Sequence, residues 1–227
     1  AVFLFLVGML ILCKSAGVLV YAVVGCLLIL LTGWRTQVLV AAVLAVLVTA
    51  YPVMRGAHLV PVDDIVGYAR GFSEERSDSL KFRFDNEDQL LLHAQQRGTF
   101  GWGGYERNQL HNPSTGELSS IADGGWIIAL GKLGWAGFAA FFGLAALPLL
   151  SLGRRAWGRR AGQVSRHTSG LALILAFGLV DLLPNATHVP FDWLITGALL
   201  GVAERMARGQ VEPGKVAAPP RARRTVI

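Results

Sequence analysis

Six apolar runs recur along this 227-residue chain, at 1–13, 17–33, 37–54, 124–150, 168–183 and 190–204. A helix of about 20 residues crosses the hydrocarbon core of a bilayer, because each residue adds 1.5 Å of rise. The chain is 53% hydrophobic and only 16% charged, so these runs cannot all lie inside one small water-soluble domain. The sequence therefore predicts an all-α, polytopic membrane protein, with the last two spans short enough to need tilt or local thinning.

A polar segment between the third and fourth runs divides the chain. We expect transmembrane helices over 1–56, a helical loop domain over 57–120, and three transmembrane helices over 121–204 with a basic loop near 151–167. The tail, 205–227, is rich in Pro, Ala and Arg and is expected to be disordered. The first run opens with no basic region and no cleavage site, so we interpret the chain as a fragment whose first span is truncated.

Basic side chains mark one side of the predicted membrane. Twelve Lys and Arg residues lie in the tail, in 151–167 and after the second run, whereas 57–120 holds six against ten acidic residues. Because short basic loops stay in the cytoplasm, the 57–120 loop is predicted to face outward. This topology, together with anionic headgroups, accounts for the net charge of +6, and no nucleic-acid partner is expected.

The outward loop carries signals for three helices. An Asp pair at 63 and 64 can cap a short helix over 64–72, and Ser73 followed by two Glu residues begins a second helix. Asn86 with a Gln three residues later forms a capping-box pattern. That pattern predicts a third helix, over about 86–97, which could lie on the membrane surface.

Arg76 and Arg83 are seven residues apart on the second predicted helix. Their guanidinium groups therefore share one face, about 10 Å apart along the helix axis. Two fixed cations suit a pyrophosphate or a polyanionic sugar. The alternative is a solvated amphipathic helix, in which Arg83 and Glu87, and likewise Lys81 and Asp85, form ordinary ion pairs across one turn.

The segment 98–105 combines four glycines with three aromatic residues. Such a turn is flexible and presents rings, and aromatic faces stack on the C–H surfaces of sugars. Trp102, Gly103 and Gly104 are therefore candidate substrate-binding residues. The alternative is a loop whose rings only anchor at the headgroup level of the bilayer.

His111 is the leading candidate for a general base, because its side chain titrates near neutral pH. Glu87 and Asp123 are the other candidates, and an ordinary polar loop residue is the alternative for His111. The sequence has no zinc-ligand spacing, no phosphate-binding glycine loop and no nucleophile elbow. We therefore expect neither a metal nor a nucleotide cofactor.

Several of these motifs together resemble the C-terminal part of membrane proteins of the O-antigen polymerase/ligase family. They are Glu75-Arg76-Ser77, Lys81 to Asp88, Phe100-Gly101-Trp102-Gly103-Gly104, Arg107-Asn108, and Asp123-Gly124-Gly125-Trp126 running into Gly131 and Gly134. Lys14-Ser15 resembles a short basic motif of the family, and a large outward loop late in a multi-span chain also agrees.

The resemblance implies a C-type glycosyltransferase-like fold in a bacterial inner (cytoplasmic) membrane. Family members transfer a glycan from undecaprenyl pyrophosphate to a second glycan (polymerases) or to lipid A core (ligases), with inversion and without a metal or nucleotide sugar. Phosphate contacts would fall first to Arg83, and then to Arg76, Lys14 and Arg107. Membrane lipids and a chain-length regulator are further partners that the resemblance implies.

Ligases of the family carry an outer-loop His, a small polar residue, and a glycine pair after a fixed gap. His111-Asn112 begins this pattern, but Ala122 stands at the first glycine position and Gly124 comes two residues late. We therefore expect a polymerase for O-antigen, capsule or exopolysaccharide, with a ligase as the alternative. A non-catalytic transport or flippase subunit is a third hypothesis, with Lys132 and Asp181 as its main intramembrane candidates.

Overall fold

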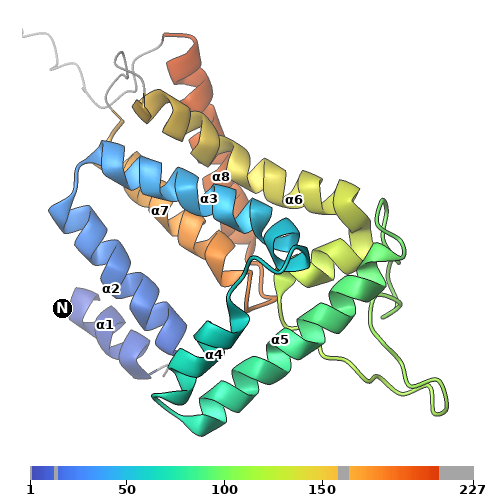
Figure 1. The fold of residues 1–227 in the computed structure, drawn as a ribbon. Helices are drawn as coiled ribbons and strands as arrows, with labels where there is room; N and C mark the ends of the chain where they lie inside the picture. Colours follow the sequence, from blue (N-terminus) through green and yellow to red (C-terminus); the bar gives the residue numbers. More distant parts are fainter. Residues whose placement is uncertain (1, 13–14, 158–163, 210–227) are drawn as a thin grey trace, which may run out of the picture.

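The computed structural model describes residues 2–12, 15–157 and 164–209. Within these ranges the chain forms eight helices and no β-strand (Figure 1). They are α1 (Val2–Leu12), α2 (Ala16–Leu31), α3 (Trp34–Gly56), α4 (Val62–Arg70), α5 (Glu74–Gln95), α6 (Gly125–Trp157), α7 (Arg166–Asp181) and α8 (Pro190–Ala207). The predicted all-α class is confirmed.

Each of the six apolar runs in the sequence coincides with a helix, as predicted. α3 and α6 are long and apolar enough to cross a membrane. The runs that became α1, α2, α7 and α8 are helical as well, and their passage through the bilayer stays a prediction. The predicted disordered tail lies largely outside the described residues, as does part of the basic loop at 158–163.

The core lies where α3 packs against α6 and α7, and where α6 packs against α8. On α3 the fully buried residues Val38, Ala41, Ala45 and Val48 recur every three or four positions, which places them on one face of the helix. Small residues bring α3 and α6 close together, since a Cβ added to Gly153 would stand 2.5 Å from that of Ala42.

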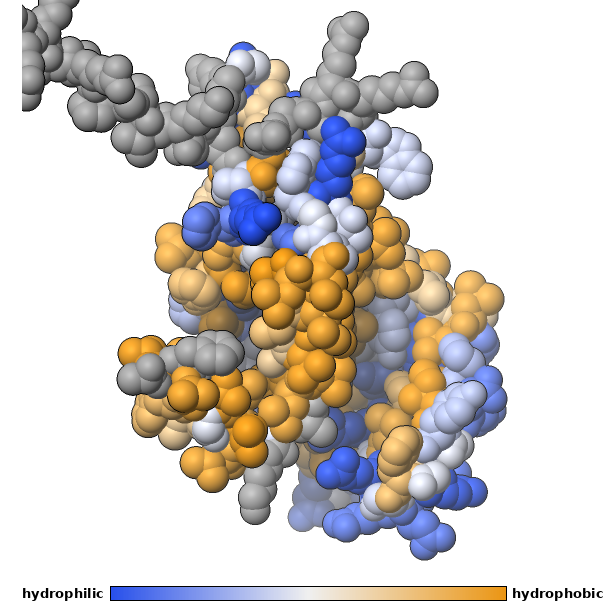
Figure 2. All heavy atoms as spheres, turned by 90° about the vertical axis from the view of Figure 1, so that its left-hand side faces the viewer, coloured by the Kyte–Doolittle hydropathy of each residue, from blue (hydrophilic) through white to orange (hydrophobic). Residues whose placement is uncertain are grey.

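Large apolar side chains also cover the outside of the helical bundle. Val43, Val46 and Leu144 are each at least half exposed. Figure 2 shows a band of hydrophobic residues with hydrophilic residues at both of its ends. Contiguous apolar surface on this scale is unusual for a soluble monomer and matches the apolar belt of an α-helical membrane protein.

The polar hairpin α4–α5 lies at one end of the bundle (Figure 1). Ser73 caps α5 as predicted, accepting a hydrogen bond from the Arg76 amide. The Asp pair does not cap α4, because the N-cap is Pro61 and both Asp residues lie within the first turn.

The predicted helix boundary at Asn86 is wrong, because α5 continues unbroken from Glu74 to Gln95. The Asn86 side chain donates to the Phe82 carbonyl within the helix and accepts a hydrogen bond from the Ile121 amide. A side chain that resembled a local cap therefore tethers the segment before α6 to α5.

The loop after α5 packs against a kink in α6 at Gly134, where φ is 65° and ψ is −169°. The kink leaves amide and carbonyl groups of α6 free for other partners. The loop donates hydrogen bonds to these carbonyls and accepts hydrogen bonds from these amides. Trp102 and Gly103 donate their amides to the carbonyls of residues 131 and 132, while the amides of residues 135 and 136 donate to the carbonyls of residues 98 and 99. The loop is therefore held by the backbone of a predicted membrane span.

Candidate functional site

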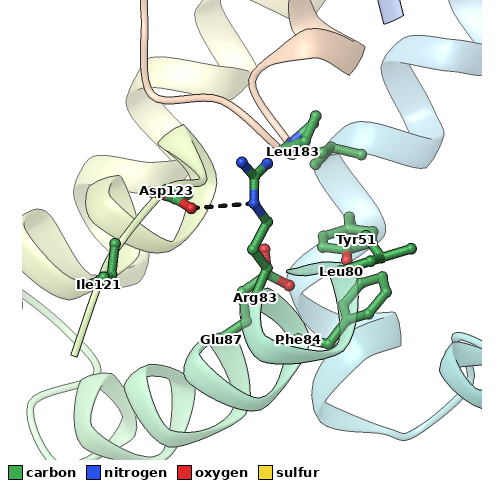
Figure 3. Close-up of a pocket in the computed structure, with 9 residues that line it drawn as sticks. Tyr51, Leu80, Arg83, Phe84, Glu87, Ile121, Asp123 and Leu183 are labelled. Atoms are coloured by element: carbon green, nitrogen blue, oxygen red, sulfur yellow. Dashed lines mark ion pairs between the residues drawn. The ribbon is translucent and has the colours of Figure 1, made fainter. Parts of the chain in front are cut away.

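A pocket of about 180 Å³ lies between α5, the end of α3, and the segments before α6 and after α7 (Figure 3). We call it the Arg83 pocket. It combines apolar walls with three charged side chains and the phenol of Tyr51, which could act on a substrate. Its lining residues are Tyr51, Leu80, Arg83, Phe84, Glu87, Ile121, Asp123, Leu183 and Pro184.

Arg83 reaches across this pocket to Asp123, with 3.3 Å between its Nε and the carboxylate Oδ2. The two side chains are 45% and 42% exposed, so an anionic ligand can displace one from the other at small cost. Neither one-turn ion pair forms among the described residues. Arg83 pairs with Asp123 while Glu87 lies beside Arg55, and no ion pair joins the described side chains of Lys81 and Asp85. The alternative in which Arg83 pairs with Glu87 across one helical turn is therefore wrong, although Arg83 itself remains half exposed.

An open groove of about 660 Å³ continues from the pocket along α5. Arg76 and Arg83 both line this α5 groove, and Leu80 and Arg83 line the Arg83 pocket as well. The spacing predicted from the sequence therefore does bring the two guanidinium groups to one concave surface. Glu75 lies in the same groove, so the charge there is mixed.

Glu87 lies on α5 one turn after Arg83 and is buried at the inner side of the pocket. Its Oε1 accepts a hydrogen bond of 3.2 Å from the Trp126 indole. Burial raises the pKa of Glu87 to about 7, although the Trp126 hydrogen bond and the charge of Arg55 each lower it in part. Glu87 can therefore accept or release a proton near neutral pH, as a general base must.

Arg55, at the end of α3, is a residue of this site that the sequence analysis missed. Only 3% of its side chain is exposed, and its Nη2 lies 2.9 Å from Oδ1 of Asp88. The same nitrogen donates to the Phe84 carbonyl, and the guanidinium group lies over the Phe84 ring. A single Arg after an apolar run looks like an interface anchor, so only the contacts of Arg55 with α5 show its role.

Trp102, in the turn at 98–105, packs against the protein instead of lining the pocket, whereas Phe100 and Tyr105 are exposed. Trp102 stacks on His93 with ring centroids 4.3 Å apart, its indole donates to the His93 carbonyl, and Arg97 covers the ring. Arg107 donates to the Gly104 carbonyl, and Gly103 lies so close that an added Cβ would meet the Arg107 guanidinium. Sugar binding by these residues stays a prediction.

His111 is exposed and forms an isolated β-bridge with Leu118 in the loop. It is not among the residues that line the Arg83 pocket. Of the three predicted catalytic residues, the structure therefore brings together Glu87 and Asp123. Lys14 lies outside the described residues, and no group of three His, Cys, Asp or Glu side chains in the described part of the chain could hold a metal ion.

The fold and this site define an α-helical membrane protein that gathers two arginines and a buried carboxyl group in its polar hairpin. The chain belongs to the O-antigen ligase family, whose family model matches residues 1–142. That match includes Arg76, Arg83, Glu87 and Asp123, and gives the chain an enzymatic function of the general O-antigen ligase or polymerase type. Its substrates are in general a lipid-linked glycan and an acceptor. No curated protein and no solved structure matches the chain.

Proposed function

We propose that the protein is an inverting glycan polymerase of the bacterial inner membrane. It transfers an oligosaccharide from undecaprenyl pyrophosphate to a hydroxyl of a second glycan at the Arg83 pocket, on the outer face. The observation that carries this proposal is that Arg83 lines both the pocket and the α5 groove, with Arg76 beside it and Glu87 behind it.

The two arginines supply what a pyrophosphate leaving group requires. It departs as an anion, so it needs stabilisation of charge more than it needs a proton. Arg83 can donate two parallel hydrogen bonds to phosphate oxygens, and Arg76 adds a second cation along the groove. When phosphate replaces Asp123 on Arg83, the Asp123 carboxylate becomes free to accept a hydrogen bond from the acceptor sugar.

An apolar groove next to the pocket fits the lipid part of such a donor. This groove runs along α3, has a volume of about 270 Å³, and shares Tyr51 and Leu183 with the Arg83 pocket. A second apolar groove, between α3 and α6, shares Leu47 with the first. A charged pocket continuous with apolar grooves matches an amphiphile that has a pyrophosphate head and a polyprenyl tail.

In the proposed reaction the acceptor oxygen forms a bond to the anomeric carbon of the donor sugar while the bond from that carbon to the phosphate oxygen breaks. The bonding electrons leave with the pyrophosphate, whose charge Arg83 stabilises. Glu87 takes the proton of the acceptor hydroxyl, because its pKa of about 7 leaves much of it ionised at neutral pH. Attack on the face opposite the leaving group gives inversion.

Two features favour a polymerase over a ligase. The ligase-like spacing from His111 to the glycine pair is not present in this sequence. Glu87 also offers a base inside the pocket, so the proposed chemistry does not require His111. A flippase role has less support, because Lys132 lies on the exposed side of α6 and Asp181 is bonded to Asn185 at the end of α7.

The test is polymerisation of a purified lipid-linked oligosaccharide in proteoliposomes. Chains that lengthen by whole repeats support the proposal, whereas transfer only to added lipid A core identifies a ligase and transbilayer movement without transfer identifies a flippase. Arg83→Ala should abolish chain growth. Lys81→Ala is the matched control, since Lys81 is an exposed cation on the same helix outside the pocket and the groove.

A further inference from the structure

Arg55 lies between two adjacent carboxylates of α5. Its Nη2 is 2.9 Å from Asp88 Oδ1, a close ion pair. Its Nε is 3.9 Å from Glu87 Oε2, too far for a hydrogen bond. The guanidinium group therefore interacts strongly with Asp88 and weakly with Glu87, although Glu87 is the more deeply buried of the two carboxylates.

The missing bond is unusual because both of its atoms are buried. Arg55 Nε and Glu87 Oε2 have no hydrogen-bond partner, although they face each other. Buried charged groups normally pair, since an unmade bond leaves the cost of desolvation uncompensated. Here the guanidinium group is held on its other side by Asp88 and by the Phe84 carbonyl, which explains why it stops short of Glu87.

We propose that Asp88 is a positioning residue that holds Arg55 away from Glu87 and so leaves Glu87 a stronger proton acceptor. The inference rests on the proposed function, because it concerns the group assigned there to proton transfer. Asp88 itself does not line the Arg83 pocket. It acts on the reaction only through Arg55.

Apart from Arg55, the described groups around Glu87 supply no cation that is free to pair with it. From α3, Tyr51 and Arg55 face the carboxyl group, and from α6 the Trp126 indole bonds to it. Arg83 and Asp123 line the same pocket and are engaged with each other. Arg55 is therefore the cation that can hold Glu87 ionised, and Asp88 limits how strongly it does so.

Loss of the Asp88 charge lowers the pKa of Glu87 in two ways. Glu87 no longer experiences a neighbouring negative charge, and Arg55 becomes free to form the missing bond to Glu87 Oε2. Both favour the ionised carboxylate, so the pKa of Glu87 falls. The half-exposed Asp88 side chain, at 47%, can be replaced by Asn without opening a cavity.

The experiment is an infrared titration of the full chain in detergent, following the protonated-carboxyl band that Glu87→Gln removes. In Asp88→Asn the midpoint of this band should fall by about one pH unit. Asp85→Asn is the matched control, because it makes the same charge change at an exposed site on α5 and should leave the midpoint in place. A midpoint that does not fall in Asp88→Asn overturns the inference.

A rate–pH profile of polymerisation separates this inference from the proposed function. If Glu87 is the base, the acid limb of the profile moves with the infrared midpoint in Asp88→Asn, so that the rate relative to its plateau rises about fivefold at one pH unit below the wild-type midpoint. If the infrared midpoint falls and the rate profile stays, Asp88 positions Arg55 as proposed but Glu87 is not the base.

Discussion

Arg83 and Asp123 join α5 to the segment before α6 through a contact of 3.3 Å across the mouth of the pocket. Both side chains remain about half exposed, so the pair stands where a substrate phosphate would bind to Arg83. Asp123 therefore competes with the donor for the guanidinium group.

We predict that Asp123→Asn strengthens binding of the lipid-linked donor. Removal of a partly exposed competing charge is worth up to about 1 kcal/mol, or roughly a two- to fivefold fall in Kd. Equilibrium binding of donor without acceptor measures this separately from catalysis. Unchanged or weaker binding would mean that the donor does not use Arg83.

Replacement of Arg83 by Lys should impair polymerisation almost as strongly as replacement by Ala. Lysine keeps the charge but loses the planar fork that binds two phosphate oxygens at once. We expect at least about a hundredfold loss of kcat/KM for both variants. An Arg83→Lys enzyme with near-normal polymer length at equal protein level would show that charge alone suffices.

Glu87→Gln should lower turnover by about 10²- to 10⁴-fold, because Gln cannot accept the proton. In the wild type the rate should rise with pH through about 7, since the pKa of Glu87 is raised to about 7 and the ionised form is the base. Initial rates measured between pH 5 and 9 check both statements.

His111→Ala is the companion to that experiment, because His111 is the base candidate favoured by the sequence. A loss of less than about tenfold is expected if Glu87 takes the proton. The reverse result, with Glu87→Gln active and His111→Ala inactive, would assign the base to the loop histidine.

Gly101→Ala should destabilise the folded protein. Its φ is +68°, and an added Cβ would stand 2.6 Å from the Gly134 nitrogen, so both the backbone conformation and the contact with α6 resist a side chain. A loss of about 2 kcal/mol or more is expected, measured as a lower apparent Tm in detergent. Gly104→Ala is the control, since a Cβ there meets nothing within 4 Å.

The predicted orientation can be tested with single cysteines in a background lacking Cys13 and Cys26. Tyr105 is 96% exposed in the loop, and Trp157 is 83% exposed at the end of α6. A membrane-impermeant maleimide should label Tyr105→Cys in intact spheroplasts and Trp157→Cys only after permeabilisation. The opposite pattern would invert the topology.

The sequence predicted what depends on local pattern. Apolar runs predicted the helices, and the seven-residue interval from Arg76 to Arg83 predicted their shared face. Contacts between distant segments were not predictable in this way. Asn86 has the pattern of a cap, but it bonds to an amide 35 residues later, and Arg55 acquires its partners only when the end of α3 meets α5.

The kink of α6 also determines how this protein can be recombined with its relatives. Residues 98–103 and 131–136 exchange backbone hydrogen bonds in both directions, and Gly101 and Gly134 leave no room between them. A chimera that transplants the loop alone would therefore place foreign backbone against a mismatched helix. The exchangeable module is the loop together with the part of α6 up to and just past its kink, so a crossover point belongs after residue 136.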